Sequence, residues 1–324
     1  MKPVDTVGFW SGKRVLVAGA GGFTGSWLCR ELATAGASAI AFVKSSTPLN
    51  RLKSIAPDAT VICGDVLDYQ SVVDAMDGVE IAFNSAAIVY RETDPEAPPR
   101  TAAVSTVGAY HFCRAAKVRG LSRVIHISTP HVYGNLPADQ LPMSERTLPL
   151  PEGVFSITKY AGDLLAMSFT EQDLPVIVTR GFSKYGPAQD TDFFMAKVIT
   201  HLLERKPLFL ANPDSTRDYT YVTDVVRGYM LAAEKGKAGH LYHFGWGRST
   251  RARDAYDAIV RVIREQVGFE PEPATWNSVY RAHDIVHQLG SMEKAHRELG
   301  WTPVVSFEDG LRETVQWWRR ALGV

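Results

Sequence analysis

Short apolar runs alternate with helix-periodic segments along the first half of the chain. The runs are rich in β-branched side chains, which is typical of buried strands. Strands separated by helical segments predict βαβ units and a parallel sheet. The predicted strands are Arg14–Ala18, Ala39–Val43, Val61–Cys63, Ile81–Phe83, Val124–Ser128 and Val176–Thr179.

Helical periodicity predicts two helices beside these strands. The first follows Gly25, with Leu28 and Leu32 one turn apart and Gly36 as its C-terminal stop. The second begins at Lys159, and one of its faces carries Ala161, Leu164, Leu165 and Ser168.

The regular alternation ends after Gly181. Residues 183–217 and 249–324 are predicted to be helical and irregular, and to form a smaller lobe that covers the substrate. Residues 1–182 and 218–248 are assigned to the sheet domain. The predicted fold class is therefore α/β, a doubly wound parallel sheet with a smaller, mostly helical C-terminal lobe.

Composition and charge argue against several classes of partner. Of the 324 residues, 45% are hydrophobic and 22% are charged, as in ordinary soluble proteins. The formal net charge is zero, so bulk electrostatics gives no reason to expect binding to nucleic acid or to a membrane surface. No stretch approaches the roughly 18 apolar residues that a membrane span needs.

The cysteines and the N-terminal residues bear on the compartment. Cys29, Cys63 and Cys113 are scattered, so we expect buried, reduced thiols and a cytoplasmic protein, without a metal site. The first twelve residues show no apolar run after a basic start, so no signal peptide is expected.

A glycine-rich turn links the first strand to the first helix. Gly19, Gly22 and Gly25 are spaced three residues apart, with Phe23 and Thr24 before the last of them. Glycines let the backbone approach a pyrophosphate closely, and the helix N-terminus offers unpaired N–H groups and a positive dipole end. The turn therefore predicts a site for the phosphates of a dinucleotide.

Two segments downstream carry candidate chemistry. Thr129-Pro130-His131-Val132-Tyr133-Gly134 follows a strand, and Phe155-Ser156-Ile157-Thr158-Lys159 opens a helix. With the glycine spacing, these segments resemble the extended short-chain dehydrogenase/reductases, and among them the nucleotide-sugar epimerases and dehydratases that include UDP-galactose 4-epimerase. The resemblance covers nearly the whole chain, and it implies a Rossmann-type fold and a nicotinamide cofactor.

The resemblance also implies roles for single residues. In this family a Ser or Thr before Val-Tyr-Gly acts with a Tyr that stands four residues ahead of a Lys. Thr129 is then expected to orient the reacting oxygen, and Lys159 to lower the tyrosine pKa and bind the nicotinamide ribose. Phe155 occupies the tyrosine position and cannot exchange a proton. Loss of a general acid/base typically costs on the order of 10²–10⁴ in rate.

Phe155 has three interpretations. It is an engineered Tyr-to-Phe change that silences the site, or it is native and His131 or Tyr160 substitutes for the tyrosine, or the protein only binds its ligand. The otherwise intact surroundings favour the engineered change and an impaired enzyme.

Further positions are implied for the cofactor. Val43 stands where NAD enzymes carry an acid for the ribose 2′-hydroxyl, Lys44 and two serines follow it, and Arg51 lies further on. A cation and hydroxyls suit a 2′-phosphate, so NADP is favoured over NAD. The remaining contacts implied by the resemblance are Asp65, Val66, Ser85, Ala86, Ala87 and Phe182.

The two residues after Thr129 bear on the type of reaction. In 4,6-dehydratases they are Asp and Glu, which carry the elimination step, whereas this chain has Pro130 and His131. Epimerases have non-acidic residues there, so the resemblance favours an epimerase. His131 is itself a candidate base at neutral pH.

Two arginines lie in segments that resemble the family's substrate motifs. Arg217 and Arg281 each offer a planar fork of donors that matches phosphate oxygens, and together they predict a nucleotide-diphosphate sugar as the substrate. Ser183 replaces the family's substrate-contacting Asn, so the sugar and the base stay open.

The predicted function is epimerisation at C4 of a nucleotide-diphosphate sugar through a transient keto intermediate. The alternatives are a keto-sugar reductase, a uronate decarboxylase, a non-catalytic nucleotide-sugar binder and a hydroxysteroid or flavonol-type reductase. The resemblance implies a homodimer that pairs through two helices in a four-helix bundle.

Overall fold

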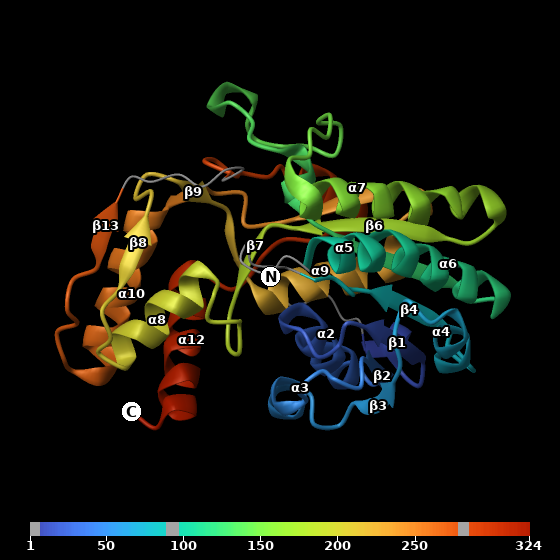
Figure 1. Cartoon of the computed structure of the whole chain (residues 1–324), viewed down its shortest axis with the longest axis horizontal. Coiled ribbons are helices and arrows are strands. Elements are labelled where there is room, and N and C mark those ends of the chain that lie inside the picture. Colours follow the sequence, from blue (N-terminus) through green and yellow to red (C-terminus); the bar gives the residue numbers. More distant parts are fainter. Residues whose placement is uncertain (1–6, 89–96, 278–284) are drawn as a thin grey trace.

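A seven-stranded parallel sheet forms the larger lobe of the computed structural model, which describes residues 7–88, 97–277 and 285–324 (Figure 1). The strand order is β11-β6-β5-β4-β1-β2-β3, and every neighbouring pair is parallel. The strands are β1 (Arg14–Ala18), β2 (Ser38–Val43), β3 (Thr60–Cys63), β4 (Ile81–Asn84), β5 (Arg123–Ser128), β6 (Val176–Gly181) and β11 (Leu241–Phe244). The predicted Rossmann-type fold is confirmed.

Alternate side chains of the central strands supply two cores, one on each face of the sheet. Val15 and Val17 of β1 pack on one face, and Leu16 and Ala18 pack on the other. The first face is covered by α1 (Val7–Trp10), α2 (Phe23–Thr34), α3 (Asn50–Ile55), α9 (Val222–Lys235) and α11 (Glu293–Leu299).

The second face of the sheet is covered by helices from the middle of the chain (Figure 1). They are α4 (Tyr69–Ala75), α5 (Ala97–Ala103), the π-helical turn η1 (Val104–Gly108), α6 (Ala109–Val118) and α7 (Gly153–Ser168). Short 3₁₀ turns flank α7 in the chain, with η2 (Pro130–Tyr133) and η3 (Ala138–Gln140) between β5 and α7, and η4 (Thr170–Gln172) between α7 and β6.

The strand order reverses between β1 and β4, which are hydrogen-bonded neighbours although β2 and β3 lie between them in the chain. At such a switch point the loops at the carboxyl ends of the strands diverge and leave a crevice, where open α/β sheets bind their ligands. The glycine turn after β1 lies at this crevice.

A third core holds the smaller lobe together, at the left of Figure 1. It is built by α8 (Phe194–Leu203), α10 (Ala252–Val267) and α12 (Phe307–Leu322). Three strand pairs connect and cover it, β7 (Ser183–Tyr185) with β10 (Tyr219–Tyr221), β9 (Thr216–Arg217) with β12 (Thr250–Arg251), and β8 (Phe209–Ala211) with β13 (Thr275–Asn277).

One helix lies outside the lobe to which the sequence assigned it. Residues 249–324 were expected in the smaller lobe, but α11 packs against α9 and β11 of the sheet lobe. Its Ala295 and Leu299, and Trp301 after it, are buried in the sheet core, and the Trp301 indole donates to Asp224 O at 3.0 Å. The chain therefore returns to the sheet before it forms α12.

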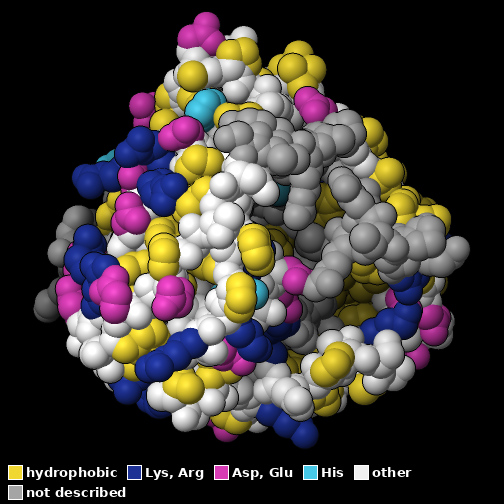
Figure 2. Space-filling model, turned by 60° about the vertical axis from the view of Figure 1, so that its left-hand side comes forward, with side chains coloured by type: hydrophobic (Ala, Val, Ile, Leu, Met, Phe, Trp, Pro, Cys, Tyr) yellow, Lys and Arg dark blue, Asp and Glu magenta, His cyan; other side chains and the backbone are white. Residues whose placement is uncertain are grey.

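Two expectations from composition can be compared with the structure. Cys29 and Cys113 are buried as expected, but Cys63 is exposed because it ends the edge strand β3. None of the helices in the described ranges is long and apolar enough to cross a membrane. The face shown in Figure 2 carries acidic and basic side chains side by side, in keeping with zero net charge.

Candidate active site

The glycine turn forms a cradle that side chains would fill. Gly19 has a φ of 75°, and a Cβ there would lie 2.8 Å from the carbonyl carbon of Ser85 at the end of β4. A Cβ at Gly25 would lie 2.8 Å from Cα of Ala20 and closer still to the Gly19 carbonyl oxygen. The turn is closed by Gly22 N–H, which donates to Gly19 O at 3.0 Å, and α2 starts at Phe23. This backbone-lined cradle at a helix N-terminus fits a dinucleotide pyrophosphate.

The residues expected to bind the 2′-hydroxyl or 2′-phosphate of the dinucleotide ribose lie beside this cradle, at the carboxyl ends of β2 and β3. Lys44 Nζ pairs with Asp65 Oδ2 at 3.0 Å, and Asp65 also accepts from Leu67 N–H at 3.0 Å. Burial alone would raise the pKa of Asp65, but these two donors lower it overall. Arg51, which the sequence offered as a second cation, donates instead to Ala188 O and Gly21 O and pairs with Asp190. Arg51 therefore holds the glycine turn against the loop after β7.

Three of the predicted cofactor residues have buried side chains. Val43, Val66 and Phe182 pack in the apolar cores. Ser85 donates its hydroxyl to Ala18 O at 2.6 Å, which joins the ends of β4 and β1. Ala86 and Ala87 follow at the same edge, and Ala87 is exposed.

The predicted catalytic residues come together from two elements. Thr129 accepts from His131 N–H at 3.3 Å and so caps η2, and the rings of His131 and Phe155 meet edge to face with centroids 6.2 Å apart. Lys159 is buried one turn further along α7 and donates to Ile127 O at 2.8 Å. Burial lowers the pKa of Lys159, partly offset by the nearby Asp163 carboxylate.

His131 opens onto a small cleft of about 130 Å³ between η2, the start of α7 and β9. His131 is exposed on the side that faces the cleft, and desolvation of its ring by the cleft walls, with the charges of Arg217 and Lys184, lowers the pKa of His131 to about 4. The ring is therefore neutral near pH 7. The cleft is lined by His131, Gly134, Asn135, Glu152, Ser156, Arg217 and Ile285.

The predicted substrate residues are placed in part. Arg217 reaches the cleft from β9 and donates to Thr216 O at 2.9 Å and Val286 O at 3.4 Å. Ser183 donates to Gln288 Oε1 at 2.9 Å. Arg281 lies outside the described residues. Tyr160, a sequence candidate for the missing base, packs with the apolar cluster around Val132 and Leu136.

Sequence reasoning missed a buried polar network below the catalytic residues. Asp163 accepts from Ser128 at 2.7 Å and Arg180 at 2.7 Å, and lies 3.5 Å from His126 Nε2. Arg180 also stacks over the Tyr133 ring. Asp163 could have been found from its spacing, because a residue four positions after Lys159 lies on the same face of the helix.

A second lysine was also missed. Lys184 stands on β7 and donates to Gly181 O at 3.2 Å, at the carboxyl end of β6. Burial and the nearby Lys159 ammonium lower the pKa of Lys184 to about 8. No family motif marks this position, so only the fold brings it to the site.

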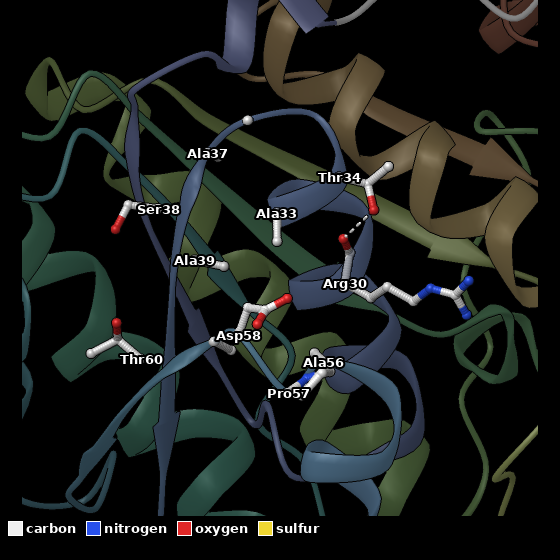
Figure 3. Close-up of a pocket in the computed structure, with 12 residues that line it drawn as sticks. Arg30, Ala33, Thr34, Ala37, Ser38, Ala39, Ala56, Pro57, Asp58 and Thr60 are labelled. Atoms are coloured by element: carbon white, nitrogen blue, oxygen red, sulfur yellow. Dashed lines mark hydrogen bonds between the residues drawn. The ribbon is translucent and has the colours of Figure 1, made fainter.

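A hollow of about 540 Å³ lies at the opposite end of the strands from the glycine turn (Figure 3). It is lined by the end of α2 and the amino ends of β2 and β3, including Arg30, Asp58 and Thr60. Ligands of open parallel sheets bind at the carboxyl ends of the strands, so this hollow is not the candidate site. Among residues 7–88, 97–277 and 285–324, no three His, Cys, Asp or Glu side chains are grouped as metal ligands would be.

Comparison with known proteins places the chain in a family. The model of the GDP-mannose 4,6-dehydratase family matches residues 16–314. The dTDP-glucose 4,6-dehydratase of Streptomyces niveus is 28% identical over 94% of this chain and 93% of its own length.

Solved structures agree with this assignment. The dTDP-glucose 4,6-dehydratase of Streptomyces venezuelae, with NAD and TYD bound, superposes with a TM-score of 0.86 at 26% identity, covering 96% of this chain and 98% of that one. The UDP-glucose 4-epimerase of Thermotoga maritima, with UDP-glucose, gives 0.84 at 27% identity and covers 95% and 99%. Among the similar structures, both NAD and NADPH complexes occur.

The carboxyl-end crevice, the glycine cradle and the Thr129–Lys159 pair are thus found in a chain that matches these enzymes over nearly its whole length. The chain belongs to the GDP-mannose 4,6-dehydratase family, within the nucleotide-sugar epimerases and dehydratases of the extended short-chain dehydrogenase/reductases.

Proposed function

We propose that the protein epimerises a nucleotide-diphosphate sugar at C4 through a transient keto intermediate. The observation that carries the proposal is the start of η2, where Pro130 and a neutral His131 stand in place of an acidic pair. Without acids at these two positions, the chain lacks the groups that would remove water from the sugar. A bound nicotinamide dinucleotide supplies the hydride acceptor and donor. Thr129 hydrogen-bonds the reacting oxygen, and Lys159 holds the nicotinamide ribose.

Product analysis separates epimerisation from its alternatives. The purified chain is incubated with NAD or NADP and a panel of UDP-, dTDP- and GDP-sugars, and products are read by proton NMR and mass. We expect a C4 epimer of unchanged mass and no net change in cofactor absorbance. Loss of water indicates a dehydratase, and loss of CO₂ a uronate decarboxylase. Stoichiometric NADPH consumption with a keto sugar indicates a reductase. Binding without turnover indicates a binder.

The cofactor is proposed to be NADP. Val43 ends β2 without a carboxylate, and the exposed Lys44 follows it. Replacing Lys44 with Asp puts a second carboxylate beside Asp65, so we expect NADP affinity to fall at least about tenfold and NAD affinity to change less. Calorimetric titration of both dinucleotides measures this, with Lys53→Asp on α3 as an exposed control. Equal losses for the two dinucleotides contradict the proposal.

Arg217 is proposed to bind the diphosphate of the sugar nucleotide. Because a guanidinium matches two phosphate oxygens, we expect Arg217→Ala to weaken UDP or dTDP binding roughly 10–100-fold. Loss of its charge also raises the pKa of His131, which histidine NMR can follow. The exposed Arg248→Ala is the control. Unchanged affinity in Arg217→Ala favours the hydroxysteroid or flavonol-type reductase.

A homodimer is proposed through the outer surface of η1, α6 and α7. Val107, Tyr110, Ile157 and Leu164 are 41–56% exposed there, on helices that pack beside one another (Figure 1). An apolar surface of this kind is commonly buried by a second copy of the chain. Sedimentation analysis is expected to show a dimer that Leu164→Glu dissociates and that Val304→Glu, in the exposed segment between α11 and α12, does not. A monomeric parent chain rejects this arrangement.

A further inference from the structure

The amine of Lys184 lies at the level of the predicted catalytic threonine. Ser128, the last residue of β5, is paired with Arg180 of β6, so Thr129 follows the end of β5 beside Gly181, the last residue of β6. Lys184 Nζ is 3.2 Å from Gly181 O on the β6 side. Lys159 Nζ is 2.8 Å from Ile127 O on the β5 side. Two amines thus flank the strand ends from which Thr129 projects.

The neighbouring charge that acts on this amine is positive. The Lys159 ammonium lowers the pKa of Lys184, and the charge of Lys184 in turn lowers the pKa of His131. Arg217 adds a further positive charge at His131. The carboxylates on the neighbouring elements accept hydrogen bonds from groups other than Lys184. Asp163 accepts from Ser128 and Arg180, and Asp218 accepts from Trp246 N–H and Gly247 N–H.

Such surroundings favour the neutral amine. With a pKa of about 8, set by burial and Lys159, roughly half of the Lys184 amines are unprotonated at pH 8. A group whose pKa lies near the working pH both accepts and returns a proton efficiently. His131, with a pKa of about 4, is a much weaker base. Tyr160 packs in the apolar cluster.

We propose that Lys184 is the acid/base that replaces the family tyrosine missing at Phe155. This inference rests on the proposed function. The neutral Nζ takes the proton of the sugar C4 hydroxyl while the C4 hydrogen leaves with its electron pair to an oxidised nicotinamide dinucleotide, and a C4 carbonyl forms. When hydride returns to the other face of that carbonyl, the Lys184 ammonium gives its proton to the oxygen. Protons and electrons balance over the cycle.

Four variants test this role. Lys184→Met removes the amine, Lys184→Arg keeps a positive charge that does not titrate, Phe155→Tyr restores the phenol, and the fourth combines Phe155→Tyr with Lys184→Met. We expect both single Lys184 variants to lose at least about 100-fold in kcat, while dinucleotide affinity changes less than about threefold. We expect the double variant to recover at least about tenfold over Lys184→Met, because a phenol again transfers the proton. Circular dichroism and melting temperature confirm folding.

A second readout needs neither substrate nor turnover. The rate at which an amine-acylating reagent modifies Lys184 is followed against pH by peptide mass spectrometry, in the chain without ligand. We expect a midpoint near 8, and Lys206, exposed on the smaller lobe, is the internal reference. A midpoint near the ordinary lysine value of about 10.4 overturns the inference.

Other results also overturn it, and they separate it from the proposed function. Lys184→Arg with activity within threefold of the parent means that only the charge matters, as it would for binding a phosphate or carboxylate. Activity that appears only in Phe155→Tyr rejects Lys184 as the substitute base but supports a silenced epimerase. No turnover of any nucleotide sugar, in the parent or in Phe155→Tyr, rejects the proposed function and the acid/base role together.

Discussion

Gly25→Ala is expected to abolish measurable dinucleotide binding. The new Cβ would lie 2.8 Å from Cα of Ala20 and closer to Gly19 O, and both are backbone atoms of the turn itself. Backbone cannot rotate away as a side chain can, so the turn must open and its N–H groups lose their convergence on a phosphate. We expect affinity to fall at least about 100-fold, or ~2.7 kcal/mol.

Calorimetric titration with NAD and NADP measures this loss. Gly8→Ala is the matched control, because a Cβ at Gly8 meets nothing within 4 Å. Circular dichroism shows whether Gly25→Ala keeps its fold. A folded Gly25→Ala protein that binds a dinucleotide within about threefold of the parent would show that the cradle is not the phosphate site.

Asp163→Ala is expected to have the largest effect on stability. Asp163 and Arg180 are about 95% buried and hydrogen-bond at 2.7 Å, and His126 lies beside them. Removing one partner of a buried pair leaves the other charge uncompensated and typically costs 3–5 kcal/mol. Urea unfolding measures the difference. The control is Asp254→Ala, which breaks the exposed pair with Arg251 and should cost about 0–1 kcal/mol.

The effect of Asp163 should depend on pH in a defined direction. Burial would raise the pKa of Asp163, but hydrogen bonding from His126 and the charges of Arg180 and Lys159 lower it overall. A carboxyl with a lowered folded pKa stabilises above the unfolded value of about 3.9, and that contribution is lost as pH falls through the folded pKa. The difference between parent and Asp163→Ala should therefore shrink in acid. A difference that grows in acid contradicts the ionised network.

Six of the seven strands of the sheet were predicted from sequence, and the central ones among them are buried on both faces, whereas β11 was missed. Continuous apolar runs such as Val124–Ser128 mark such strands, and the six predicted strands each lie within one that the structure contains. The glycine turn was predictable because its chemistry is local. The return of α11 to the sheet was not predictable, since Ala295, Leu299 and Trp301 show helical and apolar character but not which lobe they join.

The residues of the candidate site were predictable where each belongs to a recognisable motif. Thr129 and His131 belong to one motif and Phe155 to another, and the structure brings the three together. The burial of the Val43 and Phe182 side chains depends on the cores that receive them, which neither motif specifies. Lys44 and Asp65, like Ser183 and Gln288, pair only after folding.

Lys184 changes the interpretation of Phe155. The sequence favoured an engineered change because Phe155 stood alone in an otherwise complete site. With an amine at the ends of the same strands, a native site that uses another acid/base becomes the interpretation that we propose. Lys184 is positioned by the pairing of β7 with β10, in which it lies opposite Thr220. No pattern within residues 183–187 predicts that position.

The most direct test is a crystal structure of the chain with NADP and a UDP- or dTDP-sugar. The proposed function requires the dinucleotide pyrophosphate on the Gly19–Gly25 turn, the sugar diphosphate at Arg217, and the sugar C4 between Thr129 and the nicotinamide ring. A dinucleotide bound anywhere other than the carboxyl ends of β1 and β4, or a sugar whose C4 faces away from the nicotinamide, would contradict it.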